Sequence, residues 1–88
     1  MLEPVRDPLL QEREKTHGSF ETHAATTQKF KDILHSMPNW DGLSPRHKES
    51  LEMIVHKIGR IASGKANFKD HWDDIAGYAK LGSEACEG

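Results

Sequence analysis

Residues 44–64, Ser-Pro-Arg-His-Lys-Glu-Ser-Leu-Glu-Met-Ile-Val-His-Lys-Ile-Gly-Arg-Ile-Ala-Ser-Gly, decide the fold of this chain. Ser44 suits an N-cap, and Pro45 suits the first position of a helix because its missing N–H has no partner there in any case. Apolar residues then recur at the spacing of one helical face, at Leu51, Ile54, Val55, Ile58, Ile61 and Ala62. Gly64 is a natural C-cap. The stretch predicts a helix over 44–63.

Two further amphipathic segments flank this one. Ser19 is a candidate N-cap for a helix that ends before Pro38, with an apolar face of Phe20, Thr27, Phe30, Leu34 and Met37. The last segment carries an apolar stripe of Phe68, Trp72, Ile75, Ala76 and Ala79 and ends near Gly82. No segment shows strand alternation. We therefore expect an all-α fold of three antiparallel helices, at about 19–37, 44–63 and 68–82, in a small and oligomeric helical bundle.

The remaining parts of the 88 residues are short. Residues 1–18 read as an extended lead-in with a short helix near 9–15, residues 19–82 as the helical domain, and residues 83–88 as a frayed tail. Trp40, in a turn-rich stretch, is expected to fold over the core. Cys86 has no second cysteine to pair with, and no apolar run is long enough for a membrane span, so we expect a cytoplasmic protein.

Acidic residues form two pairs with matching spacing. Glu49 and Glu52 lie three residues apart on one expected helix, and Asp70 and Asp73 lie three residues apart on the next. Such i, i+3 carboxylates share a helix face and can converge on one cation. Carboxylate oxygens are the ligands that Mg²⁺ prefers, and Mg²⁺ in proteins commonly carries phosphate. The spacing predicts a magnesium site made by these four acids.

Neighbouring residues extend this hypothesis to a phosphate ligand. Lys57 and Arg60 follow the glutamates by one to two turns and could neutralise phosphate oxygens. Gly77 leaves room for a close approach, and Asp74 could replace Asp73 because both lie on one face. The alternative is an ordinary solvated face of charged residues, because every amphipathic helix has one.

Other candidate sites carry weaker signals. The six histidines form no compact zinc pattern beyond Glu52-x3-His56, and His23, beside an apolar stripe, is expected to be partly buried with a hydrogen bond. Trp72 shares a stripe with Phe68 and is expected to pack in the core, which leaves Tyr78 as the better residue to stack on a base. The net charge is −2 and the basic residues are interleaved with acids, which argues against a nucleic-acid-binding surface.

The pattern Glu49-x2-Glu52, spacer, Asp70-x2-Asp73 resembles the motif of MazG-like all-α nucleoside triphosphate pyrophosphohydrolases. The resemblance implies an oligomeric helical fold that holds Mg²⁺ on the four acids and hydrolyses a nucleotide. For such a reaction we expect Glu52 and Asp70 as catalytic acids, and Lys57, Arg60, Asp74 and Tyr78 as ligand-binding residues. The sequence departs from that motif at Asp70, where a glutamate is usual.

A second resemblance covers about residues 13–81. Blocks at 13–20, 51–61 and 70–79 are similar to a family of small uncharacterised phage and prophage proteins. It implies a phage accessory protein acting in the host cytoplasm. Two hypotheses follow: a nucleotide-binding protein of MazG-like fold that hydrolyses its ligand, or a non-enzymatic protein. The latter would inhibit a host defence or other host complex, in the manner of an anti-CRISPR, or would sequester a nucleotide signal.

Overall fold

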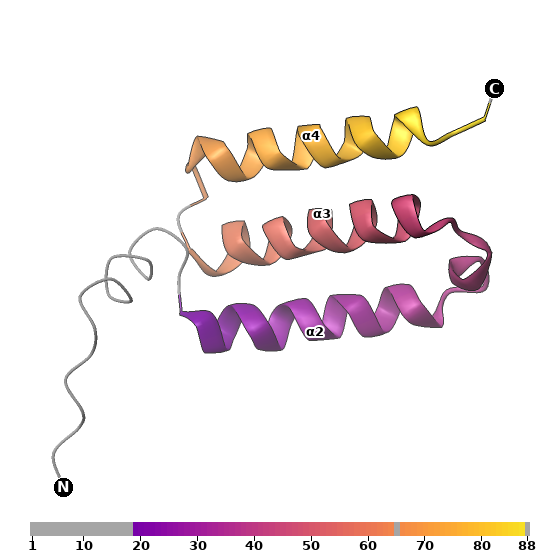
Figure 1. Ribbon diagram of the computed structural model, residues 1–88. Helices are drawn as coiled ribbons and strands as arrows, with labels where there is room; N and C mark the ends of the chain where they lie inside the picture. The colour runs from indigo at the N-terminus through magenta and orange to yellow at the C-terminus, as the bar shows by residue number, and fades with distance from the viewer. Residues whose placement is uncertain (1–18, 65, 88) are drawn as a thin grey trace, which may run out of the picture.

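The computed structural model describes residues 19–64 and 66–87. Three helices, α2 (Phe20–Ser36), α3 (Pro45–Ser63) and α4 (Lys69–Glu84), account for most of them, and a short 3₁₀ helix, η1 (Trp40–Gly42), joins α2 to α3 (Figure 1). No strand occurs in these residues, so the all-α prediction is confirmed. None of the helices in this part of the chain is long and apolar enough to cross a membrane. The predicted lead-in, 1–18, lies outside the described residues.

The helix ends follow from the capping residues. The Ser19 hydroxyl accepts a hydrogen bond from the Thr22 amide at 3.5 Å, and the Ser44 hydroxyl accepts one from the His47 amide at 3.2 Å. Helix α4 continues two residues beyond Gly82, so the expected frayed tail begins later. Gly82 remains helical and packs closely on α3, where a Cβ at this glycine would lie 3.6 Å from Ser50 Cβ.

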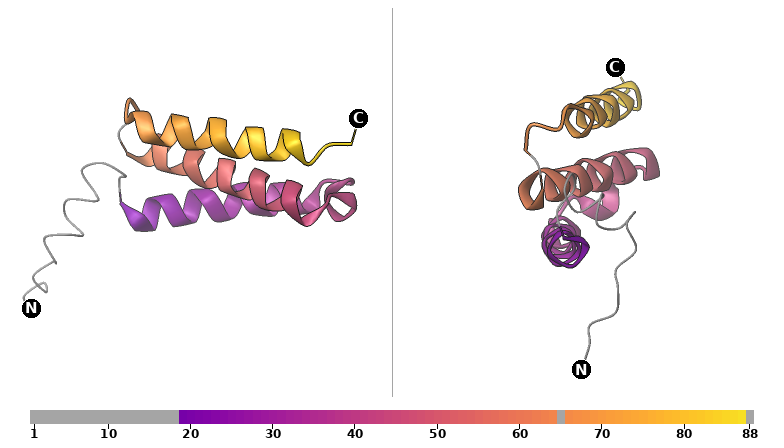
Figure 2. Two further views of the ribbon diagram at one scale, coloured as in Figure 1. Left: turned by 45° about the horizontal axis from the view of Figure 1, so that its top comes forward. Right: turned by 90° about the vertical axis from the view of Figure 1, so that its left-hand side faces the viewer.

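The three helices lie side by side in one layer with α3 in the middle (Figure 2). Helix α3 contacts its neighbours along two opposite edges. Gly59 touches Thr27 and His23 of α2, whereas Ser50 touches Gly82 of α4. Nine residues at about 100° each place Ser50 and Gly59 half a turn apart. Both neighbours run antiparallel to α3, as expected.

Helix α3 has two further sides between these edges, one on each side of the layer. Leu51 and Ile58 lie about 100° and 80° from Ser50 on one side, and Glu49 and Arg60 lie at the same angles on the other. Leu51 is 36% exposed and Ile58 39% exposed. The layer therefore has an apolar side and a polar side.

Several residues of the predicted apolar stripes are not buried in the described chain. The most buried side chains there are mainly polar, at His23, Thr27, Ser50 and His71, with Trp40 and Val55 as the buried apolar ones. His23 is 2% exposed, and its Nδ1 lies 3.3 Å from the Thr27 hydroxyl, which confirms its expected burial and hydrogen bond. Trp40 covers the core as expected. The prediction for Trp72 was wrong: this side chain is 55% exposed, and its indole N–H donates to the Ala66 carbonyl at 2.7 Å.

Two glycines in helix interiors give a matched test of the contact between α2 and α3. A Cβ at Gly59 would lie 2.5 Å from Thr27 Oγ1 and 2.9 Å from His23 Nδ1, whereas a Cβ at Gly77 meets nothing within 4 Å. We expect Gly59→Ala to lower the free energy of unfolding by about 1–3 kcal/mol through overpacking. Gly77→Ala should raise it by about 0.5–1 kcal/mol through helix propensity. Urea unfolding measures both, and equal effects would contradict the close contact.

Candidate functional site

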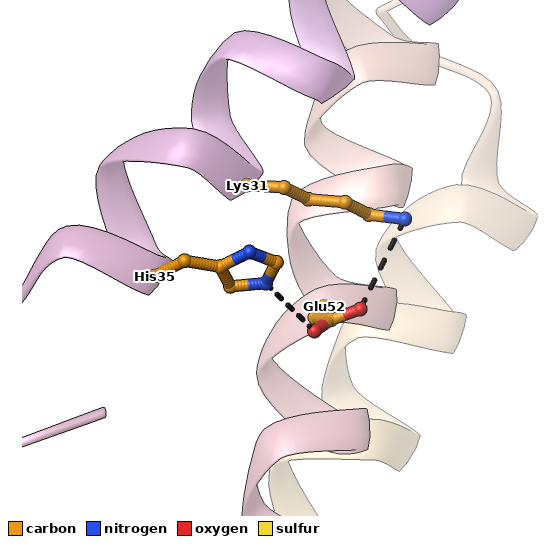
Figure 3. Close-up of polar contacts among 3 residues, drawn as sticks. All are labelled: Lys31, His35 and Glu52. Atoms are coloured by element: carbon orange, nitrogen blue, oxygen red, sulfur yellow. Dashed lines mark hydrogen bonds and ion pairs between the residues drawn. The ribbon is translucent and has the colours of Figure 1, made fainter. Parts of the chain in front are cut away.

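Glu52 lies at the boundary between α3 and α2. Its Oε1 is 3.0 Å from His35 Nε2, and its Oε2 is 4.0 Å from Lys31 Nζ, as Figure 3 shows. Lys31 and His35 lie one turn apart on α2 and both reach across to this carboxylate. The basic partners of Glu52 in the described chain therefore come from α2, not from the helix that carries Asp70 and Asp73.

The other three acids have separate surroundings. Asp73 Oδ2 accepts a hydrogen bond from Lys69 Nζ at 2.6 Å on the outer surface of α4, and that bond raises the pKa of Lys69. Glu49 borders a hollow with Arg46, Tyr78 and Leu81 near the end of α4. Asp70 lies near the start of α4, beside the end of α3. The two acidic pairs therefore do not converge on one point, although each has the i, i+3 spacing.

A groove between the end of α3 and the start of α4 gathers several of the predicted site residues. Its volume is about 370 Å³, within the range of small-molecule pockets. It is lined by His56, Lys57, Arg60, Phe68, Asp70, His71 and Asp74. We call these seven residues the α3–α4 groove. It combines two basic side chains, two acids and two histidines.

The antiparallel packing explains why the glutamates lie apart from this groove. Lys57 Nζ is 2.8 Å from Asp74 Oδ2, which fixes the level at which α3 and α4 meet. From that level, Glu52 lies five residues back along α3 and Asp70 lies four residues back along α4, in opposite directions. At about 1.5 Å per residue the two are about 13 Å apart along the helix axes. Within residues 19–64 and 66–87 no three His, Cys, Asp or Glu side chains are grouped so as to hold a metal.

The electrostatics of the groove depend on burial and on several nearby charged residues. Burial, followed by the positive charges of His23, Arg60, Lys57 and Lys31, lowers the pKa of His56 from 6.5 to about 4. The His23 and His56 rings meet edge to face at 4.5 Å. On the α4 side, the hydrogen bond from Lys57 lowers the pKa of Asp74. At neutral pH His56 is uncharged and Asp74 is ionised.

Sequence reasoning missed the contribution of the histidines. His71 is 3% exposed, and its ring packs edge to face against Phe68 at 4.9 Å. It stands three residues before Asp74, the same spacing as in the two acidic pairs, so that pattern could have drawn attention to it. His56, one residue before Lys57, was expected on a solvated polar face or as a zinc ligand with Glu52, not as a groove residue.

A second hollow adjoins the groove and shares Asp74 with it. Its volume is about 460 Å³, and its lining includes Asp73, Gly77, Tyr78 and Leu81. Gly77 has open space where a Cβ would stand. Tyr78, four residues after Asp74, also borders the hollow near Glu49. The predicted ligand-binding residues Lys57, Arg60, Asp74 and Tyr78 thus line two neighbouring hollows.

The model of a family described as a domain of unknown function, DUF6378, matches residues 1–86. No curated protein matches the chain. No solved structure matches it either. The likenesses to MazG-like pyrophosphohydrolases and to phage proteins therefore stay predictions.

The lowered pKa of His56 makes stability depend on pH in a defined window. In the unfolded chain His56 binds a proton as the pH falls through about 6.5, whereas in the folded protein it does so only near pH 4. Its contribution to stability is therefore complete above pH 6.5 and is lost as the pH falls toward 4. We expect His56→Gln to flatten the stability curve across this window in urea unfolding. A His56 imidazole that titrates near 6.5 by NMR would contradict the assignment.

Proposed function

The chain belongs to the DUF6378 family, and we propose that it binds a nucleotide or related phosphate ligand in the α3–α4 groove. The observation that carries this proposal is the position of Lys57 and Arg60 beside Asp70 and Asp74. A groove with basic groups for phosphate and acids for a cation suits a metal-bound polyphosphate better than an uncharged ligand.

Phosphate binding rests on the basic side of the groove. Lys57 is largely buried and already donates to Asp74, so its ammonium is held in place rather than free to rotate. Arg60 lies one turn further along α3 in the same lining. Both positive charges lower the pKa of His56, which shows that their field reaches into the groove. A phosphate oxygen would be stabilised by that field and by hydrogen bonds from the two side chains.

The groove offers Mg²⁺ two carboxylates rather than the four that the sequence predicted. The four-carboxylate set of Glu49, Glu52, Asp70 and Asp73 is not grouped in the described residues. Asp70 and Asp74, one turn apart on α4, both line the groove. Because Mg²⁺ is usually held by one or two carboxylates together with substrate phosphates and water, these two acids would suffice when a polyphosphate is bound.

The neighbouring hollow is the reason for proposing a nucleotide rather than a phosphate ion alone. It begins at Asp74 and extends to Tyr78, one turn further along α4. A ligand with its phosphates at Arg60 and its base on the Tyr78 ring would follow α4 from one hollow to the next. Aromatic stacking tolerates every base, so this arrangement favours nucleotides as a class over inorganic phosphate.

Hydrolysis between the α and β phosphates is the reaction implied by the MazG-like resemblance. Of the two predicted catalytic acids, Asp70 lines the groove, whereas Glu52 is held by His35 and Lys31. His56 is neutral at pH 7 and can accept a proton from a water molecule, although its low pKa makes it a weak base. We assign Asp70 to the ligand and Glu52 to the contact between α2 and α3.

Binding is tested by calorimetry with a panel of ribo- and deoxyribonucleoside triphosphates and pyrophosphate, with and without Mg²⁺. We expect Arg60→Gln to weaken binding by about 10–100-fold, because a charge-assisted hydrogen bond contributes about 1.5–3 kcal/mol. Lys80→Gln, an exposed position on α4, is the matched control and should leave the affinity unchanged. An anion in the groove should also raise the pKa of His56. Failure of every ligand to bind would sink the proposal.

Turnover is a separate question, and pyrophosphate release measures it. If the protein is an enzyme, Asp70→Asn should abolish release, and Glu52→Gln should reduce thermal stability with little change in the rate per folded molecule. Binding without release would identify a protein that sequesters its nucleotide. If Asp70→Asn and Glu52→Gln lose the rate equally, Glu52 takes part in the reaction. The glutamates of one chain would then meet the aspartates of another.

A further inference from the structure

One side of the helix layer carries large apolar side chains that nothing in the described chain covers. They come from all three helices, and each is at least one third exposed: Phe30, Ile33, Met37, Leu51, Ile58 and Trp72. We call these six residues the apolar face. Ile33, Met37 and Trp72 are more than half exposed. Soluble monomers rarely expose so many large apolar residues on one surface, so such a surface marks an interaction site.

The contacts show that these residues share one side. On α2, Thr27 points at α3 and Lys31 and His35 turn toward the side of Glu52. At about 100° per residue, Phe30, Ile33 and Met37 lie on the opposite side of Thr27. On α4, His71 and Gly82 face α3, Asp70 and Asp74 turn toward the groove, and Trp72 turns the other way. The apolar face and the α3–α4 groove are therefore on opposite sides of the layer.

The apolar core of the described chain is also small. In residues 19–64 and 66–87 the buried side chains include two apolar ones, Trp40 and Val55, against four polar ones. Covering the apolar face would therefore add hydrophobic stabilisation to a chain in which few apolar side chains are fully buried.

The size of the face fits a second copy of the chain. The helices have 17, 19 and 16 residues, or about 24–29 Å at about 1.5 Å each. With neighbours about 8–10 Å apart, the layer is about 25 Å wide and its face measures about 600–700 Å². Two such faces bury about 1,200–1,400 Å², within the range of stable interfaces. Residues 1–18 offer less, since only five of them are large and apolar and seven are charged.

We propose that two copies of this chain pack apolar face to apolar face and form a two-layered bundle of six helices. None of the six residues is charged, so the face meets itself without repulsion, as a two-fold symmetric interface requires. Both α3–α4 grooves then open outward. The proposal does not depend on the ligand proposed above, because it rests on a different side of the layer.

Sedimentation equilibrium of the full-length protein tests the dimer directly. We expect a mass twice the 9.9 kDa of one chain, with a melting temperature that rises with protein concentration. Ile33→Glu should weaken the dimer at least about 100-fold, because each copy then brings a carboxylate into an apolar contact. Gln28→Glu is the matched control: it adds the same charge to an exposed position on the other side of α2 and should leave the mass unchanged.

The substitution at Ile33 distinguishes the proposal even if the variant unfolds. Ile33 is 60% exposed in the single chain, so a stable monomer would tolerate a glutamate there. If the Ile33→Glu variant loses either the dimer or the fold, the wild-type protein must cover this face. Acrylamide quenching of Trp72 in a Trp40→Phe background gives an independent reading, since dimerisation should protect Trp72. A wild-type protein that sediments as a monomer up to submillimolar concentration overturns the proposal. Protection of Trp72 in such a monomer would assign the face to residues 1–18.

Discussion

The structure depends on the two contacts that α3 makes half a turn apart. Gly59 on one edge admits Thr27 and His23 of α2, and Ser50 on the other meets Gly82 of α4. Small residues at these points allow the helices to approach closely without large side chains between them. Helices that pack through small and polar groups direct their larger residues to the two free sides of the layer. Apolar residues then gather on one side and charged residues on the other.

Much of the fold could be predicted from the sequence because it is locally encoded. Ser19, Ser44 and Pro45 begin their helices where capping chemistry requires, and Trp40, in the turn between α2 and α3, is buried. The periodicity also identified the apolar stripe of α3 correctly. It could not show what that stripe packs against. Helical spacing groups residues on one face without identifying the neighbouring helix, so it could not show that Leu51 and Ile58 lie on the outer surface of the layer.

The candidate site shows the same limit. The spacing correctly placed each acidic pair on one helix. The two pairs could converge only if the glutamates of α3 and the aspartates of α4 lay at the same height along the helix axes. The contact between Lys57 and Asp74 sets a different level, and antiparallel helices move Glu52 and Asp70 apart from it in opposite directions. Lys57, Arg60, Asp70 and Asp74 were nevertheless identified from the sequence and lie in one groove. His56 and His71 were missed because the spacing pattern was applied to acidic residues alone, although His71 stands at the same spacing from Asp74.

Helix α3 links the two proposals and also keeps them separate. Its apolar side contributes Leu51 and Ile58 to the surface proposed for a second copy, and its polar side contributes Lys57 and Arg60 to the groove. Since the two sides are about half a turn apart, a partner on one does not reach the other. Dimerisation would therefore stabilise the groove without supplying residues to it. A protein that binds ligand only as a dimer would do so because dimerisation stabilises the layer that carries the groove, not because the site is shared.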